Sequence, residues 1–173
     1  LGGNHGSFKR CQNIRHDTCT IWSNLYTIIG LVWCRCSQSR KTRKGDDLRN
    51  WKINGVSHWW AVYSRNKRSI SIDLKEDEGL DLLKELVKKA DVFIENFLPG
   101  TLEKWGIGPQ QLNKLNKNLI ILRISGWGQT GIFKNAPGFG SLVEGMSGFA
   151  AMTGEEKQAP LLPPLALADM VAG

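Results

Sequence analysis

The chain has 173 residues, of which 41% are hydrophobic and 23% are charged, and its formal net charge is +7 at pH 7. This length fits one domain with one core, and the composition is ordinary for a soluble globular protein. The mildly apolar stretch 18–33 is broken by Ser23, Asn24 and Gly30, so it is unlike a membrane span or a signal peptide.

The positive charge is confined to the first 44 residues. They hold eight Lys and Arg and one acid, while the rest of the chain holds 15 residues of each sign. A nucleic-acid-binding protein carries its basic residues on the folded body, so we expect no nucleic-acid partner and no membrane partner. The first 44 residues also contain all the cysteines, whose spacing does not fit zinc, and we expect no metal site. These are Cys11, Cys19, Cys34 and Cys36.

A strand and a helix are predicted between residues 69 and 90. Ser69–Leu74 alternates apolar and polar side chains, which is the period of a half-buried strand. Asp77 is placed to cap a helix that runs to about Ala90. Five apolar residues are spaced so that they share one face of this helix: Leu82, Leu83, Leu86, Val87 and Ala90.

The alternation of strands and helices continues along the chain. Val92–Ile94 predicts a short buried strand, Thr101–Trp105 a helix, and Pro109–Leu115 a second helix, because proline suits a first helical turn. Leu119–Ser125 predicts the strongest strand. This order indicates an α/β fold, with a parallel sheet covered by helices on both faces.

The last 50 residues are rich in small side chains. Gly126–Gly131 is a glycine-rich loop that matches neither of the common phosphate-binding patterns. Phe139–Met152 predicts a helix suited to close packing, and a proline-containing linker at 160–164 leads to a final helix at Leu165–Gly173.

Three motifs occur in a fixed order: Asn66–Leu74, Glu95–Gly100 and Ile124–Gly131. Together they resemble the family III CoA-transferases of the formyl-CoA, carnitine and succinyl-CoA type, over about residues 44–173. The runs Gly45–Asp47 and Ser125–Gly131 look most like the mitochondrial dicarboxylate members. The resemblance implies a Rossmann-like large domain, a mitochondrial or cytoplasmic location and a homodimer for the full-length protein.

Members of that family are longer than this chain, which we therefore interpret as an N-terminal fragment. Residues 1–44 would be a non-family segment and residues 45–173 a partial large domain. The implied function is transfer of coenzyme A from an acyl-CoA, such as succinyl-CoA, to a free carboxylic acid. Coenzyme A would be a substrate, with no permanently bound cofactor.

The resemblance implies that Asp169 is the catalytic nucleophile. A desolvated carboxylate can attack a thioester to form a mixed anhydride, which divides one difficult transfer into easier steps. From its residue type alone, Asp169 would be an acid at a helix start, where the helix dipole favours negative charge.

Five residues are implied to bind coenzyme A: Ile72, Lys75, Asn96, Phe97 and Lys104. Asn96 and Phe97 follow a predicted strand at its carboxyl end, where α/β sheets bind ligands. Ile72 and Lys75 match positions that flank adenosine, and Lys104 lies where relatives often carry arginine. The structural alternatives are a polar cap for Asn96 and a solvated loop lysine for Lys75.

The chain departs from the family pattern at Gly138–Gly140. Relatives often have Gly-Tyr-Asp there, and the related racemases have Gly-His-Asp with a catalytic histidine. Phe139 cannot accept a proton, which disfavours racemase chemistry, and Gly140 lacks the usual carboxylate. The alternative function is therefore a non-catalytic fragment or pseudoenzyme from a disrupted or mispredicted gene.

The first 44 residues do not resemble the family as written. A one-base shift in reading frame over Arg15–Ser23 and over Trp33–Lys44 permits codons for family-like segments. We hypothesise a frameshift that is restored near Lys44. As written, we expect this segment to be poorly ordered and unable to supply the first strand, which usually lies near the centre of such a sheet.

Overall fold

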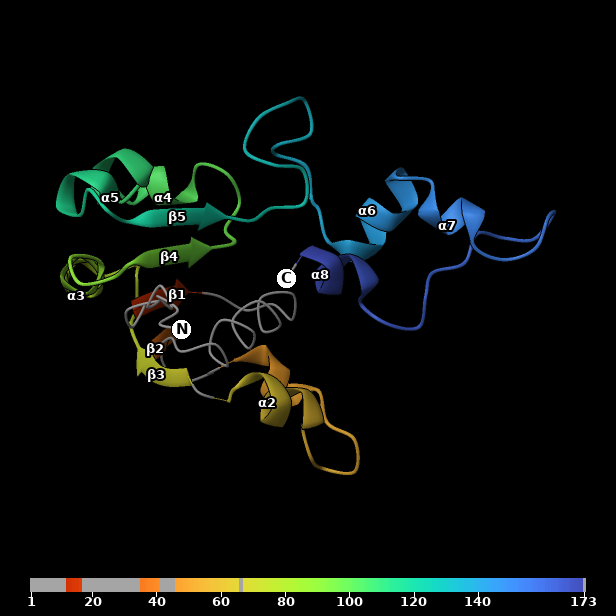
Figure 1. Cartoon of the computed structure of the whole chain (residues 1–173), viewed down its shortest axis with the longest axis horizontal. Coiled ribbons are helices and arrows are strands. Elements are labelled where there is room, and N and C mark those ends of the chain that lie inside the picture. The colour runs from red at the N-terminus through yellow and green to blue at the C-terminus, as the bar shows by residue number, and fades with distance from the viewer. Residues whose placement is uncertain (1–11, 17–34, 41–45, 66, 173) are drawn as a thin grey trace, which may run out of the picture.

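The computed structural model describes residues 12–16, 35–40, 46–65 and 67–172. Its centre is a parallel sheet of five strands in the order β3-β2-β1-β4-β5 (Figure 1). This is the order of the doubly wound Rossmann sheet, and it confirms the predicted α/β class. The strands are β1 (Gln12–His16), β2 (Arg35–Arg40), β3 (Lys67–Ser71), β4 (Val92–Glu95) and β5 (Ile120–Arg123).

The prediction that residues 1–44 cannot supply the first strand is wrong for the described part of that segment. β1 pairs in parallel with β2 on one side and with β4 on the other, so it lies at the centre of the sheet. Strand pairing uses backbone N–H and C=O groups, which every non-proline residue carries, so a segment without alternating side chains can enter a sheet. The frameshift and the boundary at residue 45 stay predictions.

β3 begins and ends earlier than the alternating pattern predicted. It covers Lys67–Ser71 and pairs with β2. Ile72 and Leu74 follow the strand, and both are buried in the core. The alternation therefore located the inward-facing residues correctly, although the hydrogen-bonded ladder ends before them.

Three helices connect the second half of the sheet. They are α3 (Asp77–Val87), α4 (Thr101–Lys104) and α5 (Pro109–Leu115). α3 and α5 pack against each other. The Asn116 side chain fixes the end of α3, because its Nδ2 donates to the carbonyl oxygens of Val87 at 3.0 Å and Ala90 at 2.7 Å.

Two details of α3 differ from the sequence prediction. Its N-cap is Glu76, which makes no side-chain capping bond, while Asp77 lies in the first turn, where its charge is favourable. Leu82 is 44% exposed, whereas Leu83 and Val87 are fully buried. The buried apolar face of α3 is thus narrower than the sequence predicted.

The core lies between the sheet and these helices. Phe93 of β4 belongs to this core and is completely inaccessible to solvent, while its neighbour Ile94 is buried as well. The connected cluster of buried residues comprises Ile72, Leu74, Leu83, Val87, Ala90, Phe93, Leu102, Ile107, Leu112 and Leu119.

A short helical segment precedes β3. It consists of the 3-10 helix η1 (Asp47–Asn50) and the helix α2 (His58–Tyr63). The guanidinium of Arg49 lies 4.0 Å from the centre of the Trp60 ring, a cation–π contact that holds the two helices together. His58 is the first residue of α2, followed by Trp59 and Trp60.

The last helices lie beyond the carboxyl ends of β4 and β5 (Figure 1). They are α6 (Gly140–Met146), α7 (Phe149–Met152) and α8 (Leu167–Ala172). The prediction of one continuous helix over 139–152 is wrong, because Gly148 adopts a left-handed conformation with φ of 81° and ends the first helical run. Among the described residues, no helix is long and apolar enough to cross a membrane.

Candidate functional site

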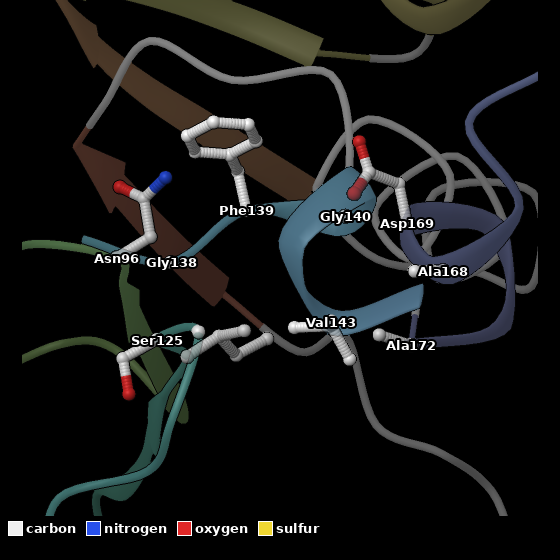
Figure 2. A pocket seen from close by; sticks show the side chains of 11 residues that line it. Asn96, Ser125, Gly138, Phe139, Gly140, Val143, Ala168, Asp169 and Ala172 are labelled. Carbon is white, nitrogen blue, oxygen red and sulfur yellow. The ribbon is translucent and has the colours of Figure 1, made fainter. Parts of the chain in front are cut away.

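A cleft of about 380 Å³ lies between the carboxyl ends of β4 and β5 and the helices α6 and α8. Figure 2 shows Asn96 and Phe139 on one side of it and Asp169 on the other. Ligands of open α/β sheets bind at this end of the strands. The lining residues are Asn96, Ile124, Ser125, Gly126, Gly138, Phe139, Gly140, Val143, Ala168, Asp169 and Ala172.

The sheet side of the cleft is built by a close approach of two backbone segments. A Cβ atom on Gly126 would lie 2.4 Å from the Cα of Gly138, so neither position has room for a side chain. Trp127 Nε1 donates a hydrogen bond of 2.9 Å to the carbonyl oxygen of Pro137. The glycine-rich loop after β5 is therefore closed at its base, which sets the position of Ser125 at the cleft wall.

Among the described residues that line the cleft, Asp169 is the one that can ionise. Its Oδ1 is buried and has no hydrogen-bond partner within the described ranges. A Cβ on Gly140 would lie 2.9 Å from this oxygen, so the missing side chain at 140 leaves space for the carboxylate. Burial raises the pKa of Asp169, and the charge of Glu144 raises it further.

Glu144 is a second acid behind the cleft. It lies on α6, is only 7% exposed, and accepts a hydrogen bond of 3.0 Å from the backbone N–H of Ala168 through Oε1. That N–H belongs to the first turn of α8, beside Asp169. Two acidic side chains therefore meet across the α6–α8 contact.

Another acid, Glu95, supports the loop that carries Asn96. Glu95 is 2% exposed; its Oε1 accepts from Nε of Arg123 at 2.6 Å, and its Oε2 accepts from the N–H of Phe97 at 2.7 Å. Arg123 also donates to both carboxylate oxygens of Glu103, at 2.7 and 3.2 Å. Burial raises the pKa of Glu95, while Arg123 and the Phe97 amide oppose that rise. The pairing fixes the chain direction after β4.

The structure brings three of the predicted site residues together. Asp169 and Asn96 line the main cleft, and Asn96 also lines a smaller hollow of about 90 Å³ with Phe97 and Lys134. The two hollows share Asn96, Ser125, Gly126 and Gly138, so they adjoin each other. The ring of Phe97 packs edge-on against Trp105, with centroids 5.0 Å apart.

The other three predicted residues lie away from the cleft lining. Ile72 is 3% exposed and belongs to the hydrophobic core. Lys75 is exposed in the turn before α3, where its backbone N–H donates to Asp73 Oδ1 at 3.0 Å. Lys104 is exposed at the end of α4. Their roles in binding coenzyme A stay predictions.

The sequence reasoning missed Ser125, Glu144 and Lys134 as residues at or beside the cleft. One signal was available for Glu144, which is the single acid within a run of small and apolar residues from 139 to 152. Within the described ranges, no group of three or more His, Cys, Asp or Glu is arranged to hold a metal ion.

The model of one protein family, described as CoA-transferase family III, matches residues 40–173. The chain belongs to this family. The match confirms the resemblance that the motifs indicated. It begins at residue 40, close to residue 44, where the resemblance was expected to begin. It makes the chain a member of a transferase family.

Curated members of the family share extended similarity with the chain. It is 46% identical over 132 residues to the succinyl-CoA–D-citramalate CoA-transferase of Chloroflexus aurantiacus, which covers 75% of this chain and 33% of that protein. It is 36% identical to the succinyl-CoA:glutarate CoA-transferase of Mus musculus, covering 75% of this chain and 30% of the relative. The chain thus spans about a third of the length of these relatives.

Solved structures share the fold over a larger part of the chain. A CAIB/BAIF family protein from Brucella suis superposes with a TM-score of 0.85 and 29% identity, over 92% of this chain and 44% of that protein.

Proposed function

We propose that the protein transfers coenzyme A from an acyl-CoA to a free carboxylic acid, through a covalent intermediate on Asp169. The main support is that Asp169 lines the cleft and that its buried Oδ1 has no hydrogen-bond partner among the described residues. A carboxylate with few hydrogen bonds holds its electron pairs more loosely than a solvated one and is the stronger nucleophile.

The reaction begins with attack by a carboxylate oxygen of Asp169 on the thioester carbonyl carbon. The new carbon–oxygen bond forms an acyl-aspartyl anhydride, the carbon–sulfur bond breaks, and the electron pair leaves with the CoA thiolate. Attack by that thiolate on the aspartyl carbonyl carbon gives an aspartyl-CoA thioester and releases the first acid. The acceptor carboxylate then attacks the aspartyl carbonyl carbon of this thioester, which forms a second anhydride and releases the CoA thiolate. The thiolate attacks the acceptor's carbonyl carbon in that anhydride, so the acceptor leaves as its CoA thioester and the Asp169 carboxylate is regenerated.

Asn96 and Phe97 are proposed to contact the CoA chain at the strand end, because they line the hollow that adjoins the Asp169 cleft. Lys75, Lys104 and Ile72 are proposed to act at the nucleotide end, away from this cleft. In this proposal the residues that contact the nucleotide of coenzyme A lie apart from Asp169. Coenzyme A is a long molecule whose thiol is far from its nucleotide, so the two contacts are compatible.

The proposed donor is succinyl-CoA, because the relatives from Chloroflexus aurantiacus and Mus musculus are named for transfer from this thioester. The proposed acceptor is a free carboxylic acid, and both of those names include a dicarboxylic acid. A homodimer of the full-length protein and a mitochondrial or cytoplasmic location are proposed on the same family resemblance.

Trapping the intermediate tests this proposal. The chain is incubated with succinyl-CoA, treated with hydroxylamine and digested, and the peptide containing Asp169 is examined by mass spectrometry. We expect a hydroxamate on Asp169 that is absent from Asp169→Asn. Asp77→Asn, which changes an exposed acid on α3, is the matched control and should retain the modification.

An unmodified Asp169 in the wild-type chain would contradict catalysis by this polypeptide. That result would favour the alternative of a non-catalytic fragment or pseudoenzyme. Modification at a different acid would retain the transferase function but reject the assignment of the nucleophile.

A further inference from the structure

Glu144 is a buried acid that the proposed reaction does not use. It does not line the cleft, yet it contacts the helix that carries Asp169, through the 3.0 Å hydrogen bond from the Ala168 N–H to its Oε1. A carboxylate that is 7% exposed loses much of its hydration. No described Lys or Arg forms a salt bridge with it, in contrast to Glu95.

We propose that Glu144 is a positioning residue for Asp169: it anchors the first turn of α8 and keeps the Asp169 carboxylate directed into the cleft beside Gly140. This inference rests on the proposed role of Asp169 as nucleophile. Three geometric observations support it: the bond to Ala168, the burial of Glu144, and the space that Gly140 leaves beside Asp169 Oδ1.

The anchoring matters because α8 is short. It extends only over Leu167–Ala172, and none of these residues is buried. Within the described part of the chain, α8 packs against the helix α6. A helix of this length has little stability of its own, so its orientation depends on tertiary contacts. The hydrogen bond from the Ala168 N–H to Glu144 joins the residue next to Asp169 to α6.

Glu144 also acts on the charge of Asp169. In the resting state two carboxylates face each other across α6 and α8, and their repulsion contributes to the raised pKa of Asp169. When Asp169 attacks a thioester, its negative charge passes to the acyl group and then leaves with the CoA thiolate. The repulsion with Glu144 is therefore relieved as the covalent bond forms, which favours the step.

The lining of the cleft is consistent with this role. Of the described lining residues, Asp169 alone can ionise. Those that follow β4 and β5 are uncharged, namely Asn96, Ile124 and Ser125. The acid that faces Asp169 from α6 is Glu144. Relatives often carry an acid at the position of Gly140. In the described part of this chain the acid near Asp169 is instead Glu144, one helical turn further along α6.

The test compares two changes at Glu144 with a matched control. Glu144→Gln keeps an oxygen that can accept from the Ala168 N–H but removes the charge, while Glu144→Ala removes both. Glu156→Gln makes the same change at an exposed acid outside the helices. Each variant is made in the full chain. The rate of Asp169 acylation by succinyl-CoA is measured against concentration, and the Asp169 carboxyl is titrated by NMR after isotope labelling, with Asp169→Asn providing the assignment.

We expect Glu144→Ala to slow acylation at saturating succinyl-CoA by roughly 10- to 100-fold, the effect typical of losing a hydrogen bond to a charged group. Glu144→Gln should slow it less and should lower the titration midpoint of Asp169. The half-saturating concentration should change little, because Glu144 does not line the cleft. Glu156→Gln should match the wild-type chain in every measurement.

Three results would overturn the inference. One is a Glu144→Gln variant with an unchanged Asp169 midpoint and an unchanged acylation rate. Another is a raised half-saturating concentration at an unchanged maximal rate, since Glu144 would then bind substrate instead of positioning Asp169. The third is an equal effect of Glu156→Gln, which would show a general response to charge.

The design separates this inference from the proposed function. If the wild-type chain shows no acylation at Asp169, the proposed function fails. The NMR titration still decides the role of Glu144, because it needs no substrate: a lowered Asp169 midpoint in Glu144→Gln supports the contact, and an unchanged midpoint rejects it.

Discussion

Two buried acids in this chain lie in opposite electrostatic surroundings. Glu95, at the end of β4, is paired with Arg123 and accepts a hydrogen bond from the Phe97 N–H. Glu144, on α6, accepts from the Ala168 N–H and faces a second acid, Asp169. The first arrangement compensates a buried charge, while the second concentrates negative charge beside a cleft.

The difference separates a structural role from a functional one. A buried carboxylate is tolerated when a cation and hydrogen bonds replace the water that it loses, as around Glu95. A pair of acids without a described cation is unfavourable for folding. Carboxylates in a cleft whose pKa is shifted by burial and by a neighbouring charge are candidates for chemistry, as at Asp169. Four predictions test this contrast.

The largest expected effect follows from breaking the compensated pair. Arg123→Leu leaves Glu95 buried without its cation and should lower the free energy of unfolding by about 3–5 kcal/mol, the usual cost of removing one partner of a buried ion pair. Urea denaturation measures this change. Adding Glu95→Gln to the same variant should restore part of the stability, because a neutral amide is easier to bury. A loss below about 1 kcal/mol for the single variant would contradict the structural role.

A smaller effect is expected from filling the space beside Asp169. The Cβ introduced by Gly140→Ala would lie 2.9 Å from Asp169 Oδ1 and should displace that oxygen. A displacement of this size should slow acylation by roughly 10- to 100-fold, since reaction depends on accurate placement of the nucleophile. The rate of hydroxamate formation on Asp169 measures this effect.

Gly145→Ala is the matched control for that substitution. It lies on the same helix, and its Cβ would meet no atom within 4 Å. It should leave acylation unchanged and raise stability by about 0.5–1 kcal/mol, because alanine restricts the unfolded chain more than glycine does. Equal rates for the two variants would mean that the space at 140 does not serve Asp169.

Replacing each acid by its neutral amide should have opposite effects on stability, although burial raises the pKa of both Asp169 and Glu95. The pKa of Asp169 is raised in the folded chain, mainly by burial and further by Glu144. The folded state therefore binds more protons than the unfolded state between the ordinary carboxyl pKa and the raised value, and this group lowers stability as pH rises through that window. Its contribution disappears below the ordinary pKa.

Asp169→Asn should consequently be more stable than the wild-type chain at pH 7, with a difference that shrinks as the pH is lowered past the raised and then the ordinary carboxyl pKa. Glu95→Gln should instead be less stable at pH 7, because it removes the buried one of the two carboxylates that pair with Arg123. Unfolding curves at several pH values measure both. Destabilisation by Asp169→Asn at pH 7 would contradict the contrast between the sites.

The smallest effect is expected at an exposed pair. Lys84 Nζ lies 2.8 Å from Asp81 Oδ1, and the two side chains are 38% and 73% exposed. Lys84→Met should change the free energy of unfolding by less than about 0.5 kcal/mol, because solvent screens such pairs. This variant serves as the baseline for Arg123→Leu. If Lys84→Met lowered the free energy of unfolding as much as Arg123→Leu, burial could not explain why the Glu95–Arg123 pair matters more.

Local patterns predicted the elements from β3 to β5 well, because side-chain periodicity and proline placement act over a few residues. α5 begins at Pro109 and ends at Leu115 as expected, and α3 begins at Asp77. The same reasoning failed for β1 and for the helix over 139–152. β1 is defined by its pairing with two distant strands, and the helix ends because of the backbone conformation of Gly148.

The sequence by itself determined the α/β class, the family motifs and Asp169 as the candidate nucleophile, since each of these depends on residue type and order along the chain. Tertiary structure alone decided which groups surround that carboxylate. It brought Gly140 and Glu144 of α6 against α8, and it placed Asn96 and Ser125 on the opposite wall. The physical reason is that burial and charge proximity, which set the reactivity of Asp169, depend on contacts between segments that lie far apart in the sequence.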